Sequence, residues 1–234
     1  MKKIILNQKS YLSYDEITNF IKQYEKLDKT KYDFILFPPV VYLSLFKDKP
    51  YKVGTQNFFS YNYGSFTGEI SLEQLKSMNI KYTLVSHPER KKIIGETYEI
   101  AKEKLYKSLS SKFNTILFIG ELSKMKNPIS YIKKELNYYL RDIEENNIKY
   151  LSICYEPYIM GASTEIKDYN KLKKIIDFIK EYINKKYDEN INVFYAGSVT
   201  KENAKEILEI TNGILLGKAS TSIDTLKEVI KELK

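Results

Sequence analysis

Three side chains that can move protons stand directly after short apolar runs of this sequence: Lys9, His87 and Glu156. His87 is the only histidine among the 234 residues. An amine, an imidazole and a carboxylate at one place could transfer a proton next to a carbonyl group. That reaction needs a positioned base, an electrophile and exclusion of water. The sequence therefore predicts proton-transfer chemistry, provided that the fold brings the three side chains together.

Taken singly, each of these residues has an ordinary explanation. A lone histidine is usually structural, and Lys9 could be one more surface lysine in a lysine-rich chain. Glu156 stands before a proline and could be a loop carboxylate, while Gly197-Ser198 could form a turn. The functional interpretation depends on the elements that position these residues.

Eight short apolar runs have strand character, and several of them are continuous, as in parallel strands covered on both faces. The runs are 4–6, 34–37, 51–54, 82–85, 115–118, 150–154, 191–195 and 214–216. Helical patterns lie between them, and capping boxes at Ser13-x-x-Glu16 and Ser71-x-x-Gln74 mark two helix starts. A third helix is predicted from Asn127-Pro128 as far as Ile143, and two more over 172–183 and 226–233. The segment after Pro38-Pro39 has the weakest helical pattern.

Eight alternating units predict an α/β fold, a closed (β/α)8 TIM barrel with eight parallel strands and outer helices, as a single domain over residues 1–234. A doubly wound open sheet is the alternative on pattern alone, but no linker divides the chain and no strand is left over. In such a barrel the carboxyl ends of the strands form one rim, where active sites lie. Small residues in Ala196-Gly197-Ser198 and at Gly217 leave backbone N–H groups free at this rim.

The composition limits the partners. The formal charge of +8 favours anions, yet all but two of the 38 basic residues are lysine and no arginine-rich run exists. Nucleic acid is therefore the weaker interpretation, whereas a membrane surface, a small phosphorylated substrate and an ordinary solvated surface all remain open on charge alone. The one cysteine, Cys154, is expected to be a buried thiol in a reducing compartment. Without a signal peptide or a span of ~18 apolar residues, no membrane association and a cytoplasmic location are predicted.

Seven segments, in order along essentially the whole chain, resemble the triosephosphate isomerase family. They are FPPVVYL, VGTQNFFSYNYGSFTGEIS (53–71), HPER followed by IIGET, FIGE with Phe118 in the place of the family's cysteine, YEP (155–157), YAGSV (195–199) and GILLGKAS (213–220). Each motif alone is weak evidence for the family. Seven motifs in this order, on a matching barrel pattern, are strong evidence for it. The resemblance implies interconversion of dihydroxyacetone phosphate and D-glyceraldehyde 3-phosphate through an enediolate.

The resemblance also implies a role for each matching residue. Glu156 matches the general base, and His87 matches the electrophile, a histidine that is neutral in this family. Asn7 and Lys9 match the family's Asn-x-Lys, in which the cation stabilises enediolate charge and attracts the substrate. Glu89 matches an acid that supports the lysine.

A second group of positions matches the family's substrate-binding residues. Ser198, Gly217 and the backbone of Lys218 match the phosphate cup. Gly161 matches the tip of a closing loop, and Met160 is expected to supply, together with Leu215, the apolar cover over the base. No cofactor and no metal are expected, because no Cys/His cluster exists to bind one.

The sequence departs from the family pattern at several places. The closing loop after Glu156 is one residue shorter and lacks the hinge tryptophan, and the loop after Glu121 is trimmed. Pro88 replaces a serine, which removes a hydroxyl and an N–H from the site. Lys218 replaces the second glycine of the phosphate cup, where it could assist phosphate binding or reshape the pocket.

The 57–69 loop keeps the family length, so a homodimer is predicted. Thr67 matches a residue that reaches towards Asn7 of the partner. Two alternatives remain open at this stage. One is an isomerase of a longer phosphorylated ketose, such as a tetrulose phosphate, which the altered loop and Lys218 motivate. The other is a non-catalytic paralogue that binds a phosphorylated ligand, against which the retained base and histidine count.

Overall fold

A computed structural model describes residues 1–157 and 168–233. In this part of the chain, strands β1 to β8 pair in sequence order, each parallel to its neighbours, and β8 returns to β1 to close the barrel. The strands are β1 (Lys3–Asn7), β2 (Asp33–Phe37), β3 (Lys52–Thr55), β4 (Tyr82–Val85), β5 (Asn114–Ile119), β6 (Leu151–Tyr155), β7 (Asn192–Ala196) and β8 (Gly213–Leu216). The predicted TIM barrel is confirmed, and the open-sheet alternative is wrong because β1 and β8 are paired.

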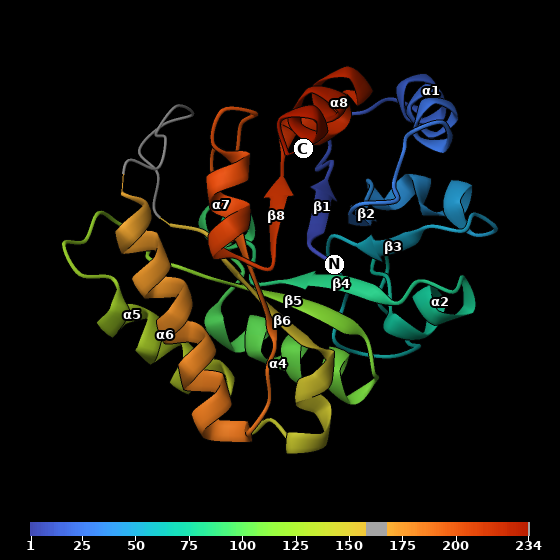
Figure 1. Ribbon diagram of the computed structural model, residues 1–234. Helices are drawn as coiled ribbons and strands as arrows, with labels where there is room; N and C mark the ends of the chain where they lie inside the picture. The colour runs from blue at the N-terminus through green and yellow to red at the C-terminus, as the bar shows by residue number, and fades with distance from the viewer. Residues whose placement is uncertain (158–167, 234) are drawn as a thin grey trace.

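The helices lie outside the strands (Figure 1). They are α1 (Tyr14–Glu25), α2 (Leu72–Ser77), α3 (Pro88–Lys92), α4 (Tyr98–Ser110), α5 (Ile129–Tyr139), α6 (Tyr169–Tyr187), α7 (Ala204–Ile210) and α8 (Ile223–Glu232). The described ranges also contain the 3-10 helices η1 (Val40–Phe46), η2 (Glu145–Tyr150) and η3 (Lys218–Thr221). The last helix, α8, contacts the first, α1, so the outer ring closes together with the strands.

Local sequence signals explain several helix starts. Both capping boxes are present, with each cap hydroxyl accepting a backbone N–H three residues on and the Glu16 or Gln74 side chain accepting the cap's own N–H. The segment after Pro39 forms the 3-10 helix η1 rather than an α-helix. Helix α5 ends at Tyr139, earlier than the pattern to Ile143 predicted, although Ile143 is still buried. Apolar spacing continued past the end of the helix because the following turns pack on the same core.

Two apolar clusters hold the barrel. One fills the space between strands and helices. The other fills the barrel interior with side chains that include Phe37, Phe118, Phe194 and Leu215. Cys154 belongs to this inner cluster and is fully buried, as predicted, and burial raises the pKa of its thiol. None of the helices in the described part of the chain is both long and apolar enough to cross a membrane.

Candidate active site

The carboxyl ends of β1, β4, β6, β7 and β8 surround a cavity of about 520 Å³. Its lining includes, among the residues that the sequence singled out, Lys9, His87, Glu156, Ser198, Leu215, Gly217 and Lys218. Asn7 contacts this group through His87. The fold thus brings Lys9, His87 and Glu156 together in one cavity, which is the condition that proton-transfer chemistry required.

His87 is held by the start of a helix. It is the N-cap of α3, and its Nδ1 accepts the backbone N–H of Glu89 at 3.2 Å. Pro88 occupies the first helical position, where a missing N–H leaves no intrahelical bond unmade. Pro88 therefore fits the local backbone and helps to begin the helix that fixes the histidine.

Burial and this hydrogen bond define the state of the imidazole. Burial lowers the pKa of His87 to about 4, so the ring is neutral near pH 7. Since Nδ1 accepts a hydrogen bond, the proton of the neutral ring is assigned to Nε2. Nε2 lies 3.9 Å from Oε2 of Glu156 and 3.4 Å from Nδ2 of Asn7. The Phe118 ring packs against the imidazole, with centroids 4.6 Å apart. The N–H of a neutral ring therefore faces the cavity.

Glu156 is placed by its backbone. Its N–H donates to the carbonyl of Ile119 at 3.0 Å, which continues the pairing of β6 with β5 by one residue. Gly120 lies against it with φ of 151°, and a Cβ at Gly120 would come within 2.0 Å of the carbonyl oxygen of Glu156. Only glycine fits there, because both the conformation and the space exclude a side chain.

The Glu156 carboxylate is poised to accept a proton. Burial raises its pKa to about 7. Its buried Oε2 has no hydrogen-bond partner among the residues that the structure describes. A buried carboxylate oxygen without a partner is costly, and such costs concentrate at functional sites.

Lys9 is fixed in an uncommon conformation. Its φ is 51°, in the left-handed region, its N–H donates to Oδ1 of Asn7 at 3.2 Å, and its carbonyl accepts from the Gln56 amide at 2.9 Å. Its Nζ forms an ion pair with Glu89. The charge of Lys9 favours the ionised form of Glu156 and the neutral form of His87. Gln56 directly follows β3. It was not assigned a role from sequence, although a polar residue after a strand is the same signal that marked Lys9.

The opposite side of the cavity is formed by backbone. Ser198 has φ of 45°, and its carbonyl accepts from the Asn203 side chain at 3.0 Å. Gly217 lies beside Lys9, because a Cβ at this glycine would be 3.4 Å from Lys9 Cε. Lys218 begins η3 without a left-handed φ, so its backbone accommodates a side chain, and that side chain is exposed.

The described residues do not place three of the sequence-based candidates in this arrangement. Gly161 and Met160, assigned to the closing loop, lie outside the described residues. Thr67 is exposed on the 57–69 loop, away from the cavity of its own chain.

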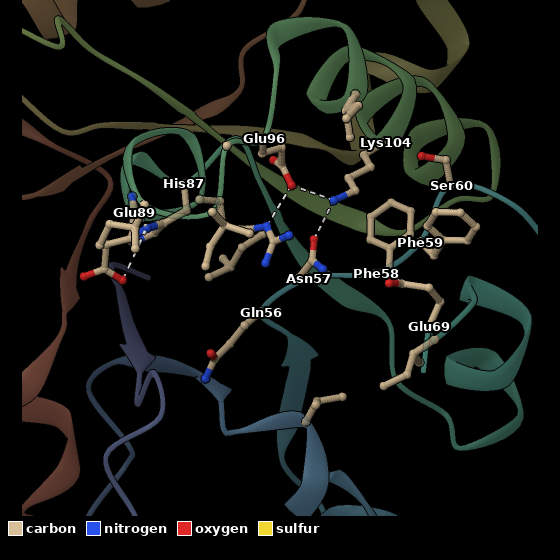
Figure 2. A pocket seen from close by; sticks show the side chains of 18 of the residues that line it. Gln56, Asn57, Phe58, Phe59, Ser60, Glu69, His87, Glu89, Glu96 and Lys104 are labelled. Carbon is tan, nitrogen blue, oxygen red and sulfur yellow. Dashed lines mark hydrogen bonds and ion pairs between the residues drawn. The ribbon is translucent and has the colours of Figure 1, made fainter. Parts of the chain in front are cut away.

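A second groove, of about 970 Å³, adjoins the site and is lined by the 57–69 loop, α3 and the start of α4. Figure 2 shows His87 and Glu89 on one side of this groove and Phe58 and Phe59 on the other. Lys104, which is buried, donates to Oε2 of Glu96 at 2.6 Å and to Oδ1 of Asn57 at 2.7 Å between the two sides.

Comparison with known proteins agrees with the fold. A sequence model of the family described as triosephosphate isomerase matches residues 2–233. The chain belongs to the triosephosphate isomerase family. Among curated members of the family, the Lawsonia intracellularis protein is 33% identical, with 85% of this chain and 83% of that protein covered. The Alkaliphilus metalliredigens protein is 31% identical, covering 98% and 99% of the two chains, and the Mycoplasma genitalium protein is 30% identical, covering 97% of each.

These matches confirm the resemblance that the seven motifs indicated, and they confirm the predicted enzyme class, an isomerase. Within the triosephosphate isomerase family, the local departures of this chain have structural explanations. Pro88 begins α3, Phe118 packs on the imidazole, and Lys218 takes up a backbone conformation that needs no glycine.

Proposed function

We propose that the chain interconverts dihydroxyacetone phosphate and D-glyceraldehyde 3-phosphate through an enediolate, without a cofactor or a metal. One observation carries the proposal: a carboxylate with a pKa of about 7 and an imidazole with a pKa of about 4 face each other across 3.9 Å in one cavity. A base that titrates near pH 7 and a neutral N–H donor are the pair that proton transfer between adjacent carbons requires.

In the proposed mechanism, Glu156 removes the proton from the carbon next to the carbonyl group. The Nε2–H of His87 donates a hydrogen bond to the carbonyl oxygen, on which negative charge develops. Lys9 stabilises that charge, and Asn7 holds the Lys9 backbone while it lies beside the imidazole. Glu89 orients the ammonium of Lys9 through their ion pair.

The substrate phosphate would occupy the side of the cavity formed by Ser198, Gly217 and Lys218. Backbone N–H groups beside these small residues bind an anion, and the side chains of Lys9 and Lys218 add positive charge along the cavity. Leu215, buried at the floor, excludes water next to the base. Gly161 is kept in the proposal as part of the closing loop on the strength of its motif position alone.

A homodimer built through the 57–69 loop is part of the proposal. The groove beside the site and the exposed apolar side chains around it, Tyr61, Phe66, Ile93 and Ile94, support it. Thr67 of one chain would then approach Asn7 of the other. A cytoplasmic location and a single domain spanning residues 1–234 complete the proposal, and the buried, unpaired Cys154 is consistent with a reducing compartment.

A coupled assay with two sugars tests the reaction. Turnover of glyceraldehyde 3-phosphate that exceeds turnover of a tetrulose phosphate is the expected result. The reverse preference would replace the proposal with an isomerase of a longer ketose. Thermal stabilisation by 2-phosphoglycolate without turnover of either sugar would make the chain a phosphate-ligand-binding protein.

A further inference from the structure

A buried ion pair lies behind the cavity, outside the residues that line it. Nζ of Lys91, at the end of α3, is 3.5 Å from Oε1 of Glu135 on α5, and each side chain is only 4% exposed. Burial lowers the pKa of Lys91 and raises the pKa of Glu135, so the surroundings oppose the charge on both partners. Apolar side chains would join the two helices without this cost.

The lysine end of the pair leads to the imidazole. His87 caps α3, and the backbone N–H of Lys91 donates to the carbonyl of His87 at 3.3 Å. Because α3 is only about one turn long, a contact that restrains the position of Lys91 also restrains the position of the cap residue, His87. The ion pair therefore restrains the element from which the imidazole projects.

The glutamate end leads to the base. Oε2 of Glu135 accepts the backbone N–H of Gly120 at 2.8 Å. Gly120 is the residue whose Cα lies against the carbonyl oxygen of Glu156, with no space for even one more carbon. Glu135 thus holds the short backbone segment on which Glu156 rests, a contact that an apolar side chain cannot make.

Hydrogen bonds fix Glu135 itself. The Tyr98 hydroxyl donates to Oε1 at 3.1 Å, and the same hydroxyl is 2.6 Å from that of Tyr131. Both carboxylate oxygens are therefore engaged, one by Lys91 and Tyr98 and the other by Gly120. A side chain held by three donors from α3, α4 and the end of β5 has a single orientation.

We propose that Lys91 and Glu135 are positioning residues of the active site, a clamp that sets the separation between His87 Nε2 and Glu156 Oε2. Neither residue lines the substrate cavity, so the clamp acts through α3 on one side and through Gly120 on the other. The inference rests on the proposed isomerase function, whose chemistry depends on that separation.

The test compares kcat and KM for glyceraldehyde 3-phosphate in four variants, each assayed well below its own melting temperature. Glu135→Leu removes the acceptor of the Gly120 N–H, Glu135→Gln keeps an acceptor, and Lys91→Met frees α3 but leaves the carboxyl group in place. Asp33→Asn is the matched control, because Asp33 pairs with Lys3 and Lys52 at the other end of the barrel.

The clamp predicts a fall in kcat with little change in KM. Glu135→Leu should lose roughly 10- to 100-fold in kcat, the loss that a misplacement of about 1 Å brings, with KM within about twofold. Glu135→Gln should recover most of that loss, and Lys91→Met should lose several-fold in kcat. The control should keep the wild-type kcat.

Wild-type kcat in folded Glu135→Leu, or in Lys91→Met if Glu135→Leu does not fold, would overturn the inference and leave the isomerase proposal intact. So would an equal loss in the Leu and Gln variants, because the acceptor would then be irrelevant. If the wild-type chain itself turned over neither sugar, the proposed function would fail first, so the two failures are distinguishable.

Discussion

Left-handed backbone occurs at both ends of the barrel, but in two different settings. At the amino-terminal end, such residues end helices and lead into strands: Asn79 after α2, Lys112 after α4 and Asp188 after α6. Each of them donates its N–H back to the last turn of the helix, which is ordinary helix termination. These residues end their helices and line neither of the two cavities described above.

At the carboxyl-terminal end, the same conformation follows strands directly, where no helix needs to end. Lys9 follows β1, Ser86 follows β4 and Ser198 follows β7, each close to or inside the candidate site. Left-handed backbone costs about 1–2 kcal/mol for a residue with a side chain. The amino-terminal end thus uses this conformation to end helices. At the carboxyl-terminal end, Lys9 and Ser198 line the cavity, and Ser86 precedes His87 while its own hydroxyl bonds that of Tyr139.

If the carboxyl-terminal end serves catalysis and the amino-terminal end serves the fold, substitutions at the two ends should have different effects. The largest effect is expected from Glu156→Gln. Loss of the base should lower kcat by about 10²- to 10⁴-fold. Because burial opposes the negative charge, the neutral amide should leave the melting temperature unchanged or raise it. Steady-state kinetics and thermal denaturation at pH 8 measure both. Loss of stability without loss of kcat would mean that Glu156 has a structural role, like the residues at the amino-terminal end, and not a catalytic one.

The pH profile should show the state of the same base. Since Glu156 must be ionised, kcat/KM should fall about tenfold per pH unit below about 7, while the pKa of about 4 for His87 leaves the imidazole neutral throughout. The pKa of Glu156 is raised on folding, so its contribution to stability is greatest at low pH and falls as pH rises towards 7. Rates and urea midpoints from pH 5 to 8 test this, and a profile without a limb near 7 would contradict the assignment.

Gly213→Ala tests the amino-terminal end, with an intermediate effect. A Cβ there would lie 2.4 Å from the carbonyl oxygen of Lys3 on the neighbouring strand. We expect a loss of about 1–3 kcal/mol in the free energy of unfolding through overpacking. The kcat of the folded variant should stay within about twofold of wild type, as for surface and scaffold changes away from a site. A large fall in kcat would show that the two ends are not independent.

Lys218→Met should have the smallest effect. The side chain is exposed, so its charge is screened, and its removal should raise KM by only about two- to fourfold, less at high salt. Lys174→Met, an exposed lysine on α6, is the charge-matched control and should leave KM unchanged. Equal changes in both variants would mean that Lys218 acts only through net charge.

The barrel could be predicted from sequence because strands buried on both faces leave continuous apolar runs and capping boxes mark helix starts. The strand bounds differ from the predicted runs by no more than one residue at either end. Helix α5 ends at Tyr139, before Ile143. The prediction was too long because Ile143 is buried against the core without being helical. The meeting of Lys9, His87 and Glu156 followed from topology alone, since parallel strands bring their carboxyl ends together.

What could not be predicted is the network that holds the site. Glu135 is buried in α5 together with Ile132, Leu136 and Tyr139. A carboxylate among these apolar positions was the sequence signal that could have pointed to a buried polar contact. Its partners, Gly120 and Lys91, come from other elements, and no local pattern identifies them. Gln56 directly follows a strand, but its bonds to the carbonyls of Lys9 and Phe37 depend on the closed barrel.

The cap that His87 gives to α3 also determines how the site should respond to acid. One hydrogen bond, from the Glu89 N–H to Nδ1, both fixes the ring and begins the helix. A doubly protonated imidazole has no lone pair left for that bond. Below about pH 4, where His87 takes up its second proton, the orientation of the imidazole and the start of α3 should therefore be lost together. Protonation of Glu156 near pH 7 should lower the activity first, and loss of the cap should follow as a second, local step at one strand end.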